Sequence, residues 1–175
     1  MAKLRKMLGG VSQPEIVRLM RMIETQSKER LAKWAVGCVQ ARYLPVFEKA
    51  APEDQRPAAA IEAVKLCILG EVKAADLKKP LADAVQAAKD AEEFPAAQAA
   101  ARAISTACAV IRTPTNALGF VFYGAAAVAY HKAGIDRPQE VYDALATEEF
   151  RELIESLEKV MIPDEKNPAK INWNC

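Results

Sequence analysis

The chain has 175 residues, of which 51% are hydrophobic and 27% charged, and its formal net charge is +1 at pH 7. This length allows one domain with a substantial core and is short for two. A charge so close to zero argues against a general nucleic-acid-binding protein. The positive charges gather in the first fifty residues, where they indicate either a solvated surface or a face for an acidic partner.

The alanine-rich composition, together with the lack of any useful run of alternating strand formers, predicts an all-α fold. We expect one domain, residues 1–175, in which about seven to eight antiparallel helices surround a buried alanine-rich central helix. The first residues lack the apolar region of a signal peptide, which predicts a cytoplasmic protein. The cysteines are scattered without zinc-ligand spacing, and we expect free thiols at Cys38, Cys67, Cys108 and Cys175.

The first helices are marked by capping residues and prolines. Residues 12–15 have the pattern of a capping box, so a helix with an apolar face to Ile23 should begin there. Ser27 should cap a second helix, residues 28–50, which Pro45 kinks or ends one turn early.

Two further helices are expected before residue 95. Asp54 is placed to cap the first of them, which ends at Gly70. The second opens at Ala74 or Asp76 with a bent or broken first turn and reaches residue 93. Hydrophobic spacing assigns Val85 to its core face, and assigns Leu66 or Cys67 to the core face of the helix before it.

Residues 95–112 and 116–133 should form the central pair of helices, with Gly134 ending the second. Because no charged residue occurs from Thr113 to Tyr130, the second helix must be buried on most faces. Its glycines and alanines should allow neighbouring backbones to approach closely. The apolar part is shorter than the roughly 20 residues that span a bilayer, so no membrane segment is expected.

The C-terminal part is expected to contain two helices and a tail. Residues 136–138 should cap a helix that continues to Ala146, and Thr147 should cap another at residues 148–161. Glu148, Glu149 and Glu152 are interpreted as solvated acids at a helix end. The extended tail, residues 163–175, should be held by docking of Trp173.

Motifs for catalysis are scarce. The chain lacks the clustered glycines of a phosphate loop. His131 is its single histidine, whereas a di-iron site needs histidines on two helices and a serine nucleophile needs an adjacent base. We therefore expect no enzyme activity, no metal and no cofactor.

The remaining candidates for partner or ligand binding are polar or aromatic residues in an otherwise plain sequence. Asp54 and Arg56 also fit a role in fixing a loop, and Asn116 fits a helix cap. Tyr123 and Tyr130 are seven positions apart and could lie either in the core or in a binding groove. His131 is expected near a helix C-terminus, where its charged form is stabilised by the helix dipole. The candidates are Trp34, Asp54, Arg56, Asn116, Tyr123, Tyr130 and His131.

Several segments resemble a bacterial family of putative immunity proteins, the immunity-five-like group. Residues 34–48, WAVGCVQARYLPVFE, resemble its W-A…C-A…L-P-l-F-E opening, and residues 54–63, DQRPAAAIEA, resemble its D-x-R-P-x-x-A-I-E-A element. Residues 70–71 resemble its G-E stop, and residues 96–102 and 116–119 resemble its alanine-rich run. The resemblance covers residues 31–134 and leaves outside it a basic N-terminal helix, residues 1–30, and the C-terminal helices and tail, residues 135–175.

The resemblance implies a protein that neutralises a toxin by stoichiometric binding. Family members carry histidines in the alanine-rich helices where this chain has Gln86, Ser105 and Asn116, so any metal or catalytic site built on those histidines should be absent here. Two alternatives stay open: a helical scaffold whose alanine-rich faces form a homo-oligomer, and a small-ligand protein. The ligand site would then use Asn116, Tyr123, Tyr130 and His131.

Overall fold

The computed structural model describes residues 3–173. Within that range the chain folds into eight α-helices and one short 3-10 helix, with no β-strand, which confirms the prediction of an all-α fold. The elements are α1 (Pro14–Ile23), α2 (Lys28–Arg42), α3 (Leu44–Ala50), α4 (Arg56–Ile68), η1 (Ala74–Leu77), α5 (Lys78–Asp90), α6 (Pro95–Cys108), α7 (Asn116–Ala133) and α8 (Gln139–Val160).

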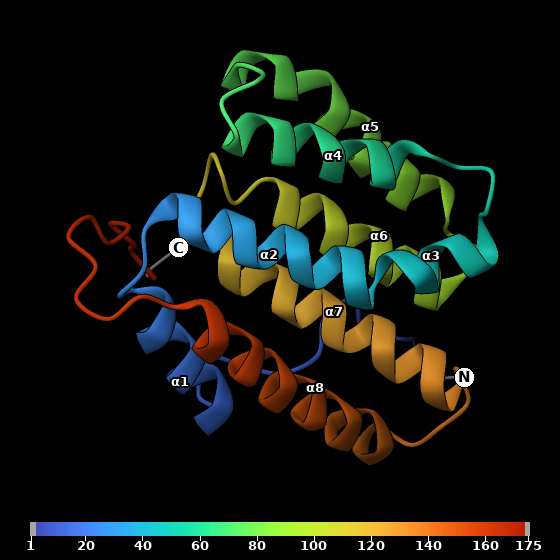
Figure 1. Ribbon diagram of the computed structural model, residues 1–175. Helices are drawn as coiled ribbons and strands as arrows, with labels where there is room; N and C mark the ends of the chain where they lie inside the picture. Colours follow the sequence, from blue (N-terminus) through green and yellow to red (C-terminus); the bar gives the residue numbers. More distant parts are fainter. Residues whose placement is uncertain (1–2, 174–175) are drawn as a thin grey trace.

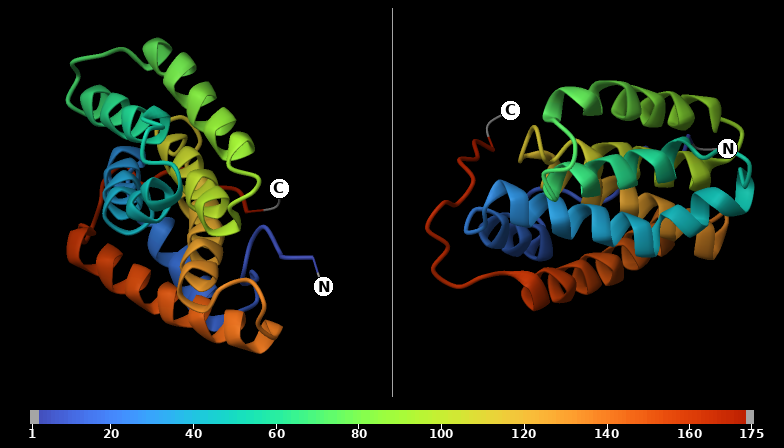
Figure 2. Two further views of the ribbon diagram at one scale, coloured as in Figure 1. Left: turned by 90° about the vertical axis from the view of Figure 1, so that its right-hand side faces the viewer. Right: turned by 45° about the horizontal axis from the view of Figure 1, so that its top comes forward.

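The helices form stacked layers around α7 (Figure 1). From α4 to α8, successive helices run in alternating directions. α6 packs along one side of α7 and α8 along the other, while α2 touches α6, α7 and α8. α4 and α5 form an outer layer over α6 and lie far from α1 and α8, as both views in Figure 2 show.

The helix α7, which has no charged residue from Asn116 to Tyr130, is the centre of the core, as its sequence predicted. Leu118 and Val128, on different turns, are only 5% and 8% exposed. Most alanines of α6 are also buried, and their small side chains let α6 lie close against α7. Gly134 follows the helix with φ of +75°, a conformation that favours glycine and ends α7 where expected.

Several predicted helix ends differ in the structure. α1 begins at Pro14 without a side-chain capping bond, so the predicted capping box is wrong. Of Thr115 and Asn116, the two residues expected to cap α7, Thr115 occupies the N-cap position, again without a side-chain bond, and Asn116 is the first residue of the helix. α6 ends at Cys108 rather than at Arg112, and turns at residues 109–112 follow it before Pro114.

α8 is one continuous helix, so the predicted break at Thr147 is also wrong. The Thr147 hydroxyl donates to the Asp143 carbonyl one turn earlier, over 3.0 Å, and accepts from Gln13 of the α1 entry, over 2.9 Å. A threonine that bonds backward in this way remains inside a helix.

The two helices around Pro45 and Lys78 follow the prediction more closely. The expected helix at residues 28–50 divides at Tyr43 into α2 and α3, with Pro45 in the first turn of α3. The broken first turn near residue 78 is the 3-10 helix η1. Val85, however, is 46% exposed and does not face the core, because α5 is an outer helix that packs mainly on α4 and α6. Of the alternatives Leu66 and Cys67, Leu66 is exposed, and Cys67 is the one that packs, partly buried, against the core.

The tail after α8 is fastened by Gln26, which is fully buried. The side-chain carboxamide of Gln26 accepts a hydrogen bond from the Ile162 N–H over 2.8 Å and donates one to the Ile162 carbonyl over 3.0 Å. The backbone carbonyl of Gln26 accepts a hydrogen bond from the Ala169 N–H over 2.8 Å. Further along, the Trp173 indole donates to Glu24, so the predicted docking of this tryptophan is confirmed.

We expect Gln26→Ala to lower the free energy of unfolding by about 2 kcal/mol, because it removes both hydrogen bonds by which the buried Gln26 side chain holds the Ile162 backbone. Limited proteolysis should then cut after residue 161 faster than in the unaltered protein. The exposed Gln55 provides a control, and Gln55→Ala should change stability by less than about 0.5 kcal/mol. Equal protease resistance in the two variants would contradict this role for Gln26.

Candidate functional site

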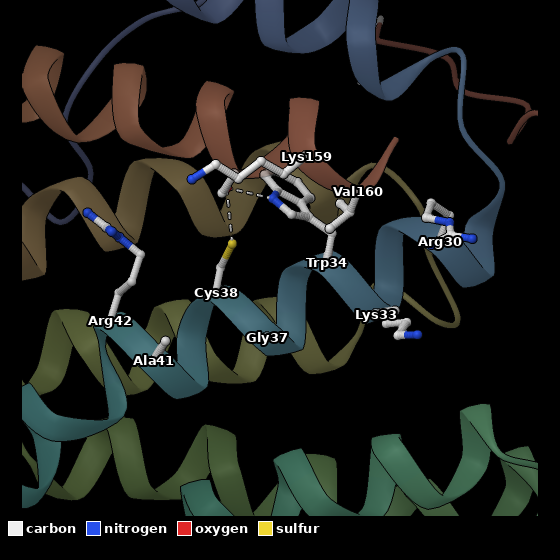
Figure 3. Close-up of a pocket in the computed structure, with 10 residues that line it drawn as sticks. Arg30, Lys33, Trp34, Gly37, Cys38, Ala41, Arg42, Lys159 and Val160 are labelled. Carbon is white, nitrogen blue, oxygen red and sulfur yellow. Dashed lines mark hydrogen bonds between the residues drawn. The ribbon is translucent and has the colours of Figure 1, made fainter. Parts of the chain in front are cut away.

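A groove of ≈ 560 Å³ lies between α2 and the C-terminal half of α8. Figure 3 shows Trp34, Cys38 and Arg42 projecting from successive turns of α2 toward α8. Successive members of this set are four positions apart, and this spacing places them on one face of the helix. The groove is lined by Arg30, Lys33, Trp34, Gly37, Cys38, Ala41, Arg42, Ser156, Lys159 and Val160.

Trp34 forms the floor of the groove and is 4% exposed. The indole N–H donates to the Ser156 hydroxyl of α8 over 2.9 Å, and Ser156 in turn donates to the Leu153 carbonyl over 2.7 Å. The Trp34 ring meets Phe120 of α7 edge to face, with ring centroids 5.1 Å apart. Trp34 therefore ties α2 to both α7 and α8 and fixes the width of the groove.

Neither Cys38 nor Ser156 is activated as a nucleophile. Burial raises the pKa of the Cys38 thiol to about 11, so it stays protonated at neutral pH. Its sulfur lies 3.5 Å from the Ser156 hydroxyl, which already has the indole as donor and a carbonyl as acceptor. A serine nucleophile needs an adjacent base, and no base contacts Ser156 within residues 3–173.

One end of the groove is closed by a buried ion pair. Arg42 donates to both carboxylate oxygens of Glu149, over 2.7 and 2.6 Å, and also to Glu152. The Tyr43 hydroxyl donates to Glu149 over 2.8 Å. Burial and the Glu149 carboxylate raise the pKa of Tyr43 well above its ordinary value, so the phenol stays a donor. Glu149 is 2% exposed, which contradicts its interpretation as a solvated acid.

The charge that remains along the groove is positive. Arg42 is offset by its two glutamates, whereas the side chains of Arg30, Lys33 and Lys159 form no ion pair within the described part of the chain. These cations flank both walls, with Arg30 and Lys33 on α2 and Lys159 on α8. The groove therefore presents unneutralised cations above an apolar floor.

A second hollow, of ≈ 500 Å³, adjoins the groove and shares Ala41 and Arg42 with it. It is lined by Lys49 of α3 and by His131 and Lys132 of the last turn of α7. His131 is exposed, as expected for a histidine at a helix C-terminus. The hollow extends the basic character of the groove toward α3 and α7.

Asp54 and Arg56 lie away from the groove and fix the loop before α4, as expected, although Gln55 rather than Asp54 occupies the N-cap position of α4. Arg56 donates to both Asp54 carboxylate oxygens, over 2.9 and 2.7 Å, and the Asp54 carboxylate also accepts from the Arg56 backbone N–H. Arg56 reaches Asp90 at the end of α5 as well, over 2.9 Å. The guanidinium holds the pKa of the Asp54 carboxyl below its ordinary value.

The remaining candidates lie in separate places. Tyr123 is half-buried in the middle of α7, and Asn116 is half-buried at its start. Tyr130 is buried, and its hydroxyl donates to the Arg5 carbonyl over 2.6 Å, so it is a core residue with a carbonyl partner. Among the predicted site residues, only Trp34 lies in the α2–α8 groove, and only His131 lies in the hollow beside it.

The α8 side of the groove was not predicted. Ser156 and Lys159 belong to no recognisable motif. They lie beside α2 only in the folded chain, because more than a hundred residues separate them from α2 in the sequence. The one available signal was helical spacing, which places Ser156, three positions after the buried Leu153, on the same side of α8 as that residue.

No helix in residues 3–173 is both long and apolar enough to cross a membrane. In the same range, no group of three or more His, Cys, Asp or Glu side chains is arranged to hold a metal ion.

Comparison with protein families gives one match: residues 21–158 fit the model of a family described as "Imm-5 like putative immunity protein". This range is wider than the segment in which the sequence resemblance was recognised. It includes all of α2 and nearly all of α8, the two walls of the groove. No curated protein and no solved structure matches the chain.

Proposed function

Because the chain belongs to the Imm-5-like putative immunity protein family, we propose that it neutralises a toxin protein by binding it stoichiometrically, without catalysis, in the bacterial cytoplasm. The family match supports the immunity role, and the absence of an activated nucleophile among the groove residues is compatible with inhibition by binding. The toxin would be made by the same or a neighbouring cell.

The groove between α2 and α8 is the proposed toxin-binding surface, and its occupant is an acidic segment of the toxin. The observation that carries this assignment is the set of unpaired cations, Arg30, Lys33 and Lys159, on opposite walls of one groove. Opposite charges across an interface speed association and select the partner. The apolar floor, with the edge of Trp34, would supply contact area for the same segment.

Gly37 is a second feature that favours a partner in this groove. It lies in the middle of α2, is exposed, and a Cβ built on it meets nothing within 4 Å. A glycine inside a helix costs about 1 kcal/mol relative to alanine, and no packing within the chain requires one here. A close approach by the toxin's backbone would account for it.

The test is co-purification and titration with the toxin domain encoded by a neighbouring gene. We expect Lys33→Glu combined with Lys159→Glu to weaken the complex about 100-fold, because it places like charge against the acidic segment. The matched control, Lys78→Glu with Lys166→Glu, changes the charge equally on exposed positions outside the groove. It should leave the affinity within about threefold, since it touches no interface.

Gly37→Leu separates binding from folding. Leucine is a strong helix former, so this variant should unfold at an equal or higher temperature while it fills the groove and weakens the complex. Unchanged affinity in both groove variants would remove the groove as the interface. Failure of the unaltered protein to bind or neutralise the toxin domain would overturn the immunity proposal itself.

The alternative of a homo-oligomer built on alanine-rich faces has less support. The alanines of α6, from Ala97 to Ala107, are nearly all buried against other helices of the same chain. They are therefore not available to a second copy.

A further inference from the structure

A separate basic pocket of ≈ 550 Å³ lies where the N-terminal segment passes the end of α5 and the beginning of α6. Its rim carries five cationic side chains and one acidic one: Lys3, Arg5, Lys6, Lys89, Arg102 and Glu92. None of the Trp34 groove residues lines this pocket, so it is distinct from the proposed toxin-binding surface.

The N-terminal wall of the pocket is held in place by buried groups. Tyr130 of α7 is 4% exposed, and its hydroxyl donates to the Arg5 carbonyl over 2.6 Å. The Leu8 side chain is buried, and its N–H donates to the Phe122 carbonyl over 3.2 Å. These two anchors, on either side of Lys6, fix the basic segment against α7. The backbone that carries the cations of residues 3–6 is therefore held opposite Lys89 of α5 and Arg102 of α6, while the cationic side chains of residues 3–6 are exposed.

The charge in this pocket is not balanced by the chain. In the part that the structure describes, the side chains of Lys3, Arg5, Lys6, Lys89 and Arg102 form no ion pair, and Glu92 is the one acidic residue of the lining. Like charges gathered around one hollow repel one another, and a bound anion would relieve that repulsion.

The start of α6 adds to this positive potential. α6 begins at Pro95, which lines the pocket together with Gln98, and the helix has no side-chain cap. Pro95 has no N–H and the Gln98 N–H bonds to the Phe94 carbonyl, so α6 contributes through its dipole, which favours negative charge at this end. The floor is apolar: the half-buried Leu4 lines it together with Ala99 and Tyr130, which are only 2% and 4% exposed. A phosphate-bearing group with an organic part would match both the rim and the floor.

We propose that this pocket binds a small, multiply charged phosphate compound of the nucleoside di- or triphosphate class. The pocket volume falls within the range of roughly 300–1,000 Å³ that is usual for small-molecule sites. Guanidinium and ammonium groups on facing walls would hold the phosphates, with Arg102 offering paired donors. The nucleoside would lie on the floor beside Tyr130.

The test is isothermal titration of the full chain with ATP, ADP, pyrophosphate and adenosine at low salt, repeated at high salt. We expect ATP and ADP to bind, pyrophosphate to bind more weakly, and adenosine not to bind. Lys89→Gln combined with Arg102→Gln should weaken ATP binding by about tenfold or more, since two of its charge contacts are lost. The matched control is Lys166→Gln with Lys170→Gln, two exposed tail residues, which should bind ATP as the unaltered protein does.

Circular dichroism on each variant checks that the helices are intact, and Arg102→Lys should retain part of the affinity. No heat of binding with any phosphate at millimolar concentration would overturn the proposal. Equal loss in the pocket and tail variants would overturn it too, because nonspecific charge would then explain the binding. Binding of an acidic peptide, but of no phosphate compound, would assign the pocket to a protein partner instead. None of these results depends on toxin binding.

Discussion

Replacing Glu149 with alanine should lower the free energy of unfolding by about 3 kcal/mol, the largest effect that we expect from a single side chain. Glu149 is the shared acceptor for Arg42 and Tyr43. Its removal leaves the fully buried Tyr43 hydroxyl without a partner and opens a cavity between α2 and α8. Arg42 is partly exposed and keeps Glu152, which limits the loss. Urea denaturation followed by circular dichroism measures it.

Two further variants test whether the loss of stability comes from the buried acceptor. Glu152→Ala removes the exposed partner of the same arginine and should cost less than about 1 kcal/mol. The triple variant Arg42→Met, Tyr43→Phe, Glu149→Leu replaces the whole polar cluster with apolar groups, and it should recover most of the stability lost in Glu149→Ala. If Glu152→Ala is as costly as Glu149→Ala, the cluster acts through surface charge and the buried-acceptor argument is wrong.

The contrast between α7 and α8 shows which features of this fold can be predicted from sequence. α7 was predictable because a long uncharged run must be buried, whatever packs against it. α8 was not predictable as one helix, because the behaviour of Thr147 depends on Gln13, which lies far away in the chain. A threonine has the same local signature whether it caps a helix or bonds backward within one.

The candidate site was predicted in part for the same reason. Trp34 was singled out as a large aromatic residue, but its partner Ser156 is 122 positions away and has no distinguishing neighbours. Glu149 was placed with solvated acids because Glu148 and Glu152 flank it. Its burial follows from Arg42 and Tyr43, which approach only once α2 packs on α8. Contacts between residues far apart in the sequence therefore decide which of these neighbouring glutamates is buried in the folded protein.

Asp54 and Arg56 show the opposite case, because their pairing is local. They are two residues apart, and the predicted role of fixing the loop is the geometry found.

The role of Gly124 could be predicted only in part. Its small size was expected to admit a neighbouring backbone, but the group that occupies the space is the ring of Tyr43.

Gly124→Ala should therefore destabilise the protein by about 2–3 kcal/mol, although alanine is the better helix former. A Cβ at this position would overlap the Cζ, Cε2 and Oη atoms of Tyr43. The ring cannot simply turn away, because it is fully buried and its hydroxyl is bonded to Glu149. Either the ring shifts and the Glu149 bond lengthens, or α7 moves away from α2.

Gly37→Ala is the matched control, because it makes the same change within a helix at a position where the added methyl group meets nothing within 4 Å. It should stabilise the protein by about 0.5–1 kcal/mol through helix propensity alone. The double variant Gly124→Ala, Tyr43→Leu tests the cause: with the smaller side chain in place of the ring, the added methyl group should cost much less than it does beside Tyr43. If Gly124→Ala were as stabilising as Gly37→Ala, α2 and α7 would not be packed around the Tyr43 ring as closely as the structure places them.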